Sequence, residues 1–301
     1  MAHRHAFAAS LLALGLTPLV ATVPASGDTA ARDTVGVARA TTPTLTSVRA
    51  RHVGNVDQTV FRFEDGVPSS VDVAWVDTLA HDGSGRPVRV AGAKVLSLVF
   101  HGADAHDQNG STVRPRIAFV LPNVITAVQA GDFEATVTVG LGVQVATSYT
   151  VRTLSDRVVV DVAAAFGSVR RKVWFVDRDA VEDGSGPSVV PVFRRVPASA
   201  PAAGVLQALF AGPTRAETAT GLRLVRSRAW GFTHLAITGG IARLQLTRGC
   251  GSGGSTITVA NEIVPTLKQF PSVDWVKISA PGGGTEQPNG PVDSIPACLE
   301  P

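Results

Sequence analysis

Residues 250–279 read CGSGGSTITVANEIVPTLKQFPSVDWVKIS, and the stretch begins at one of the chain's two cysteines. Apolar side chains recur in it at helical spacing, at Ile257, Ala260, Ile263, Val264, Leu267 and Phe270. This spacing predicts a helix whose apolar stripe packs on a sheet. Ser252 or Ser255 is placed to cap the helix, and Pro265 inside it should kink it by removing one backbone hydrogen bond. Residues 273–279 predict a closing strand.

The N-terminus is typical of an export signal. Arg4 lies in a short polar segment, an apolar run covers residues 6–21, and residues 23–25 (VPA) offer small side chains for cleavage. We predict a signal peptide at residues 1–25 and a flexible linker at residues 26–44, which are rich in Ala, Thr, Gly and Asp. The alternative is an uncleaved anchor, so a membrane contact is expected only through this segment.

Export affects how the two cysteines are interpreted. Outside the cytoplasm an even number of cysteines favours a disulfide, and Cys250–Cys298 is the one intramolecular pairing available. Closing a loop of this length stabilises the fold by roughly 4 kcal/mol in the chain-entropy model. Metal binding by two isolated cysteines is the weaker alternative, because neither a second cysteine pair nor a histidine pair accompanies them.

Length and composition set the broad class. The chain has 301 residues, 45% of them hydrophobic and 17% charged, which is enough for two globular domains. A net charge of +3 is too weak to predict nucleic-acid binding, but it permits loose attraction to an anionic cell wall. The excess of Arg over Lys and the richness in Ala and Val are typical of a high-GC bacterial genome.

Two domains with different patterns follow the linker. Residues 45–163 alternate with a period of two between Gly/Asp turns, which predicts an all-β sandwich. The expected strands cover residues 60–64, 71–76, 87–90, 94–100, 117–121, 125–130, 134–140, 144–154 and 158–163. Residues 171–281 interleave strands with helices, including a helix at 201–211 and a short one capped by Thr214, and predict an α+β domain. Residues 282–301 form a Gly/Pro-rich tail held by Cys298.

Clusters of polar residues give no positive sign of catalysis. His101, Asp104, His106 and Asp107, with His81 and Asp82 upstream, are interpreted as a polar loop and not as a metal site. The acids between Asp177 and Asp183 lack the spacing of a calcium loop and predict a solvated hairpin loop. No Gly-x-Ser-x-Gly elbow occurs, and no carboxylate pair is singled out. We therefore expect no catalytic residue, cofactor or metal.

Two segments resemble known families. Residues 172–281 resemble a GerMN domain, through the segments 173–177 (VWFVD), 190–197 (VPVFRRVP), 206–214 (LQALFAGPT) and 266–273 (TLKQFPSV). The ending 293–301 (DSIPACLEP) resembles that of secreted high-GC bacterial proteins with this domain. Residues 45–163 resemble an AMIN-like domain, through 51–54 (RHVG), 60–63 (VFRF), 82–85 (DGSG), 131–134 (GDFE) and 156–161 (DRVVVD).

The resemblance implies an envelope role. AMIN-type domains are associated with peptidoglycan, and GerMN domains with envelope assemblies in sporulation and germination. Unlike the founding GerMN protein, this chain has one such domain, no lipobox cysteine and an added AMIN-like half. Neither family supplies catalytic residues to carry over.

We therefore expect a secreted, cell-wall-associated, non-catalytic protein that binds peptidoglycan or an envelope protein and no nucleic acid. A wall hydrolase with unidentified acids and a self-assembling envelope scaffold remain alternatives. Arg62 and Arg157 are the candidate binding residues, as positive charges on predicted strands of the sandwich.

Overall fold

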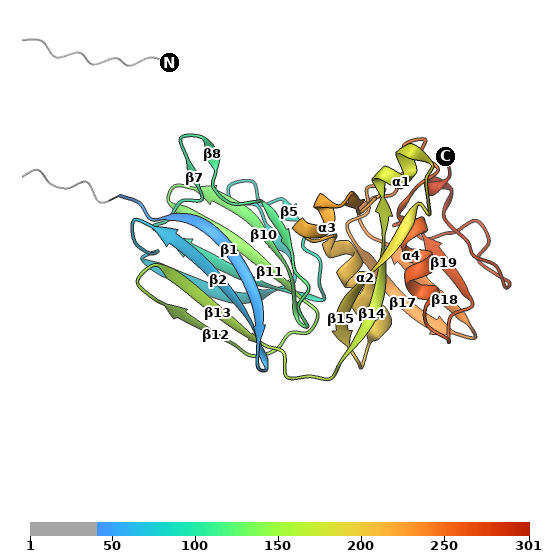
Figure 1. The fold of residues 1–301 in the computed structure, drawn as a ribbon, viewed down its shortest axis with the longest axis horizontal. Helices are drawn as coiled ribbons and strands as arrows, with labels where there is room; N and C mark the ends of the chain where they lie inside the picture. Colours follow the sequence, from blue (N-terminus) through green and yellow to red (C-terminus); the bar gives the residue numbers. More distant parts are fainter. Residues whose placement is uncertain (1–40) are drawn as a thin grey trace, which may run out of the picture. The chain divides into compact units, whose positions relative to one another are not determined.

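The computed structural model describes residues 41–301, which form one compact unit. The expected signal peptide and residues 26–40 of the expected linker lie outside the described residues. A strand-rich domain is followed by a domain of mixed strands and helices, which confirms the predicted fold classes (Figure 1). Within residues 41–301, no helix has the length and apolar character needed to cross a membrane.

The first domain is a sandwich of two antiparallel sheets, with strand orders β1-β2-β13-β12 and β3-β6-β11-β10-β9. The hairpins β4-β5 and β7-β8 are short additions. The strands are β1 Thr44–Val53, β2 Val56–Glu64, β3 Ser70–Val76, β4 Leu79–Ala80, β5 Pro87–Val88, β6 Lys94–His101, β7 His106–Asp107, β8 Gly110–Ser111, β9 Arg116–Ala118, β10 Val124–Phe133, β11 Thr136–Val143, β12 Tyr149–Thr153 and β13 Arg157–Ala163. Strand β1 was not predicted, and residues 144–148, expected as strand, form an irregular link.

Side chains that point inward from the two sheets form one core. Phe61 and Phe63 of β2 lie against Phe100 of β6, with ring centroids 4.9 and 5.5 Å apart. The Tyr149 hydroxyl donates to the carbonyl of Val73 at 3.0 Å and so joins the two sheets. On strands such as β2 and β3 the alternation seen in the sequence therefore separates a core face from a more exposed face, whereas most residues of β10 and β11 are buried on both faces.

The second domain has two three-stranded sheets, ordered β15-β14-β16 and β17-β18-β19. Strands β18 and β19 are parallel and are connected through helix α4, as a crossover requires. The elements are β14 Ser168–Asp177, α1 Arg178–Asp183, β15 Val189–Pro197, α2 Pro201–Ala211, α3 Arg215–Ala219, β16 Leu222–Arg223, β17 Phe232–Thr238, β18 Ile241–Leu246, α4 Val259–Lys268, β19 Trp275–Ser279 and the 3₁₀ helix η1 Ala297–Leu299.

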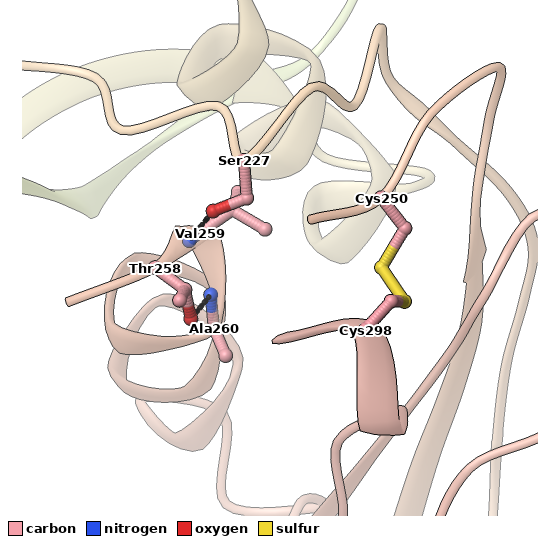
Figure 2. Close-up of a disulfide and its surroundings, with 6 residues drawn as sticks. All are labelled: Ser227, Cys250, Thr258, Val259, Ala260 and Cys298. Carbon is pink, nitrogen blue, oxygen red and sulfur yellow. Dashed lines mark hydrogen bonds between the residues drawn. A yellow bond between two sulfur atoms is a disulfide. The ribbon is translucent and has the colours of Figure 1, made fainter. Parts of the chain in front are cut away.

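Two local predictions for this domain need correction. The segment expected as a solvated hairpin loop forms helix α1, because the Asp177 carboxylate caps it by accepting from the amide of Ala180 at 3.2 Å. Helix α4 is capped by Thr258 and not by Ser252 or Ser255. The Thr258 hydroxyl accepts from the amide of Ala260 at 3.4 Å. Figure 2 shows this cap beside Ser227, whose hydroxyl accepts from the amide of Val259 at 3.0 Å.

Polar side chains of α4 and of its C-cap residue, Gln269, close one edge of strand β14. Three side chains accept hydrogen bonds from backbone amides of β14. Glu262 accepts from the amide of Val176 at 3.3 Å, Thr266 from that of Trp174 at 3.1 Å, and Gln269 from that of Lys172 at 2.8 Å. The acceptors are spaced i, i+4 and i+7 along the helix, and the donors are spaced i, i+2 and i+4 along the strand. Because a strand rises about twice as far per residue as a helix, the three acceptors and the three donors cover similar lengths. Helix side chains thus take the place of a neighbouring strand.

Glu262 is a fully buried acid in this arrangement. Burial raises the pKa of its carboxyl to about 9, although hydrogen bonds from the amides of Val176 and Val225 and the charge of Arg226 act in the opposite direction. The carboxyl is therefore protonated at neutral pH in the folded protein.

The tail is held by more than its cysteine. Cys250 and Cys298 form the predicted disulfide, with their Cα atoms 5.7 Å apart (Figure 2). The amide of Ser294 donates to the carbonyl of Val276 at 2.9 Å, and the amide of Ile278 donates to the carbonyl of Ser294 at 2.9 Å. The tail therefore covers the outer edge of β19, which would otherwise expose unpaired backbone groups.

Helix α2 joins the two domains. Eight of its eleven residues are buried, and it packs on β14, β15 and α4 while also contacting β10 of the first domain. The Gln144 amide nitrogen donates to the carbonyls of Pro122 and Arg195, both at 2.9 Å, and so bridges the domains. A Cβ at Gly204 of α2 would lie 2.7 Å from the Val196 Cβ and 2.9 Å from the Gln144 Oε1. The junction therefore depends on a glycine at this position.

We expect the Glu262→Gln variant to remove a pH dependence of stability. In the unfolded chain Glu262 loses its proton near pH 4.5, whereas in the folded protein it keeps the proton up to about pH 9. Its effect on stability therefore becomes steadily more unfavourable between these values, by up to about 1.4 kcal/mol per pH unit. Urea unfolding at pH 5, 6, 7 and 8 should show that the free energy of unfolding of the variant increases relative to that of the wild type as pH rises. A constant difference across this range would contradict the assignment.

Candidate functional site

The solvent face of sheet β1-β2-β13-β12 carries a concentration of positive charge. It holds five arginines: Arg49, Arg51, Arg62, Arg152 and Arg157. The pairing register forms three rows across the sheet, Ser47–Arg62–Arg157, Arg49–Val60–Val159–Arg152 and Arg51–Gln58–Asp161–Thr150. Because side chains alternate along each strand, these residues share the face opposite the core. We call this surface the arginine face.

A groove of about 480 Å³ runs over the arginine face. Arg49, Arg51, Arg62 and Arg157 line it around the apolar side chain of Val60. Guanidinium groups there can bind carboxylates or phosphates with two parallel hydrogen bonds. The groove therefore combines anion-binding groups at its rim with an apolar floor.

Hydrogen bonds hold part of this face in place across all four strands. The Arg51 guanidinium donates to the Gln58 oxygen at 3.1 and 2.8 Å, and the Gln58 amide donates to Asp161 at 2.8 Å. Arg152 of the neighbouring row extends this network to the last strand through an ion pair of 2.6 Å with Asp161. The network fixes the positions of two arginines at opposite edges of the sheet.

The structure brings together the two predicted binding residues, Arg62 and Arg157. Each forms an ion pair of 2.6 Å with Asp156, and hydrogen bonding to Arg157 is the largest cause that holds the pKa of that carboxyl below its ordinary value. Both guanidinium groups remain partly exposed, so they keep donors available to a ligand. Arg49 has no ion pair among the described residues. The binding role of Arg62 and Arg157 stays a prediction.

Three arginines of this face were missed by sequence reasoning. Arg49 and Arg51 lie on β1, the strand that was not predicted, and Arg152 lies on a strand whose start was placed too early. The available signal was their spacing: Arg49 and Arg51 are two residues apart, as are residues on one face of a strand. Which strands neighbour each other could not be obtained from that spacing.

The histidine-rich loop of the first domain does form a cluster, although not the one that sequence proximity suggests. Asp104 and His106 meet Asp132 of β10. One carboxylate oxygen of each aspartate and one ring nitrogen of His106 lie within 4.8 Å of one another, and such atoms can bind metal ions. Of the remaining residues, His101 binds Asp72 at 2.9 Å. Asp107 accepts from the amide of Asn109 at 2.7 Å, and His81 lies 2.8 Å from the carbonyl of Ala130.

Hydrogen bonds already occupy this cluster. One oxygen of Asp132 accepts from the amide of Ala105 at 3.0 Å, and the other lies 2.8 Å from His106 Nδ1. Hydrogen bonding and the charge of Asp132 raise the pKa of His106 above its ordinary value. We interpret the cluster as an ion pair that closes the β7-β8 hairpin onto β10, and the absence of a bound metal stays a prediction.

We expect the Asp132→Asn variant to lower the pKa of His106, because the hydrogen-bonded charge that favours the imidazolium is removed. The pair stabilises the fold below the unfolded histidine pKa of about 6.5, and this contribution is lost as pH rises through the higher folded value. An NMR titration of the His106 ring measures the shift. Asp107→Asn is the control, since its charge has a smaller effect. An unchanged His106 titration in Asp132→Asn would contradict the assignment.

A second exposed surface lies on the outer side of β14 and β15. Lys172 pairs with Phe193 and Trp174 pairs with Pro191 across the two strands. The Arg170 guanidinium lies 3.8 Å from the Phe193 ring centroid, and the Phe193 side chain is 44% exposed. A groove of about 460 Å³ passes over these residues. Exposed aromatic rings flanked by cations are typical of protein and glycan contact surfaces.

Comparison with known families agrees with this architecture. Residues 43–164 match the model of the AMIN-like domain, and residues 172–285 match the Germane model, described as sporulation and spore germination. The chain therefore carries an AMIN-like domain followed by a Germane (GerMN) domain. This content and the disulfide are consistent with an extracytoplasmic protein of the cell envelope or of sporulation and germination. No curated protein and no solved structure matches the chain.

Proposed function

We propose that this protein is exported, has no catalytic activity, and binds peptidoglycan through the arginine face of its AMIN-like domain. The observation that carries the proposal is the set of five arginines on a single sheet face, four of which line one groove. Stem peptides of peptidoglycan carry carboxylates, which guanidinium groups bind bidentately. The AMIN-like match adds support, because such domains are associated with peptidoglycan or other envelope partners.

The Germane domain supplies the second contact surface in this proposal. Trp174, Phe193 and the cations beside them would contact an envelope protein or a glycan chain. One domain would then attach the protein to the wall while the other engages a partner. A role in sporulation or germination, and origin in a high-GC bacterium, belong to the same proposal.

We expect the double variant Arg62→Ala/Arg157→Ala to lose at least about tenfold in affinity for purified peptidoglycan, a change of roughly 1.4 kcal/mol. Co-sedimentation of the full chain with peptidoglycan measures the bound fraction. Raising the salt concentration should weaken the wild type, because exposed charges are screened. The control variant Arg215→Ala/Arg243→Ala removes the same charge from exposed positions of the Germane domain and should bind normally. An equal loss of affinity in both double variants would show that binding depends only on net charge. That result would contradict specific binding by the arginine face.

The same incubation tests whether the protein is an enzyme. Muropeptides released into the supernatant are measured alongside the retained protein. Retention without release is the expected result. Release of muropeptides would overturn the non-catalytic assignment and favour a wall hydrolase.

A further inference from the structure

A pocket of about 360 Å³ lies between the two domains. Asp77 and Arg89 line it from the first domain, and Gln207, Trp230 and Arg248 line it from the second. The Asp77 carboxylate is already bonded to the Lys94 ammonium, so its charge is balanced. The volume lies within the range of small-molecule sites in proteins, which often occur between domains.

Three arginines gather beside this pocket: Arg89, Arg116 of β9, and Arg226 of the second domain. The Arg116 guanidinium donates to the backbone carbonyl of Arg89. Each of the three has a buried guanidinium nitrogen without a hydrogen-bond partner among residues 41–301: Arg89 Nε, Arg116 Nη1 and Arg226 Nε. None of the three forms an ion pair within the described chain. Buried polar groups in proteins are nearly always hydrogen-bonded, so this set calls for a partner.

The positive charge of the three arginines is not balanced by the protein around them. Burial, and then repulsion from the neighbouring arginines, lowers the pKa of Arg116 and that of Arg226 to about 10. Glu262 is the carboxyl whose charge would act on Arg226, but burial keeps it protonated at neutral pH. The three side chains are partly buried, and several uncompensated charges of one sign that are partly removed from water destabilise a fold unless a counter-ion binds.

We propose that the domain junction binds a small organic molecule through its carboxylate or phosphate group. Arg89 contacts the oxyanion from the pocket wall, and Arg116 and Arg226, which do not line the pocket, add positive charge behind it. Trp230 and Gln207 on the opposite wall face the rest of the ligand. Since Arg89 and Arg116 belong to one domain and Arg226 to the other, the bound anion also holds the two domains together.

This site is separate from the arginine face and does not depend on the proposed function. Arg62 and Arg157 take no part in it, and the arginines at the junction take no part in the groove on the sheet. Loss of peptidoglycan binding and loss of anion binding are therefore expected from different variants.

The test is the melting temperature of the full chain in sodium chloride, sodium phosphate and sodium acetate at equal ionic strength. A ligand at ten times its dissociation constant should raise Tm by roughly 2–3 °C for a protein of this size. Phosphate also stabilises folded proteins in general, so only the part of the rise that Arg89→Gln removes counts: in phosphate it identifies a phosphate site, and in acetate a carboxylate site. Arg89→Gln should abolish the rise. In chloride the Tm of this variant should not fall below that of the wild type, because the removed charge is one that the neighbouring arginines repel. Arg86→Gln removes an exposed charge three residues away and should respond like the wild type.

Absence of any rise over chloride in the wild type would overturn the proposal. A rise that persists unchanged in Arg89→Gln would overturn it as well. If Arg89→Gln does not fold, Arg226→Gln is judged by the same two criteria.

Discussion

The second domain depends on the way helix α4 completes strand β14. Glu262, Thr266 and Gln269 bind backbone amides on the edge of β14 that faces away from β15. Along most of that edge β14 has no neighbouring strand. The amide of Val176 is buried, and leaving it unsatisfied would cost about 1–3 kcal/mol. The same helix packs its apolar side chains into the domain core, so one element satisfies both the backbone and the core.

The position of α4 determines the elements around it. Helix α2 packs on α4 and β14, and from there it reaches β10 of the first domain. Gly204 permits the close approach, and Gln144 bonds across the junction. The pocket and its three arginines lie at this junction. Burial keeps Glu262 protonated, and this also leaves Arg226 without a counter-charge.

Much of the local structure could be predicted from the sequence. Period-two alternation identified most strands of the sandwich, and the apolar residues with Pro201 and Thr214 located helices α2 and α3. The pairing of two cysteines was settled by their number. The strands and helices depend on residues that are close in sequence, and two cysteines allow only one intramolecular pairing.

The sites could not be predicted to the same extent. Glu262 in a helical stripe resembles an ordinary exposed acid, and its burial follows from the free edge of a strand 86 residues away. The partnership of Asp132 with His106 joins residues 26 positions apart through sheet pairing. The arginine face and the junction likewise arise from strand order and domain contact, which no local pattern encodes.

The central claim is that helix side chains replace a neighbouring strand along β14. Amide hydrogen exchange of residues 41–301, followed by NMR, tests it most directly. The amides of Lys172, Trp174 and Val176 should exchange as slowly as the alternate β14 amides that face β15. Exchange of these three at the rates of exposed backbone, while their neighbours stay protected, would contradict the account.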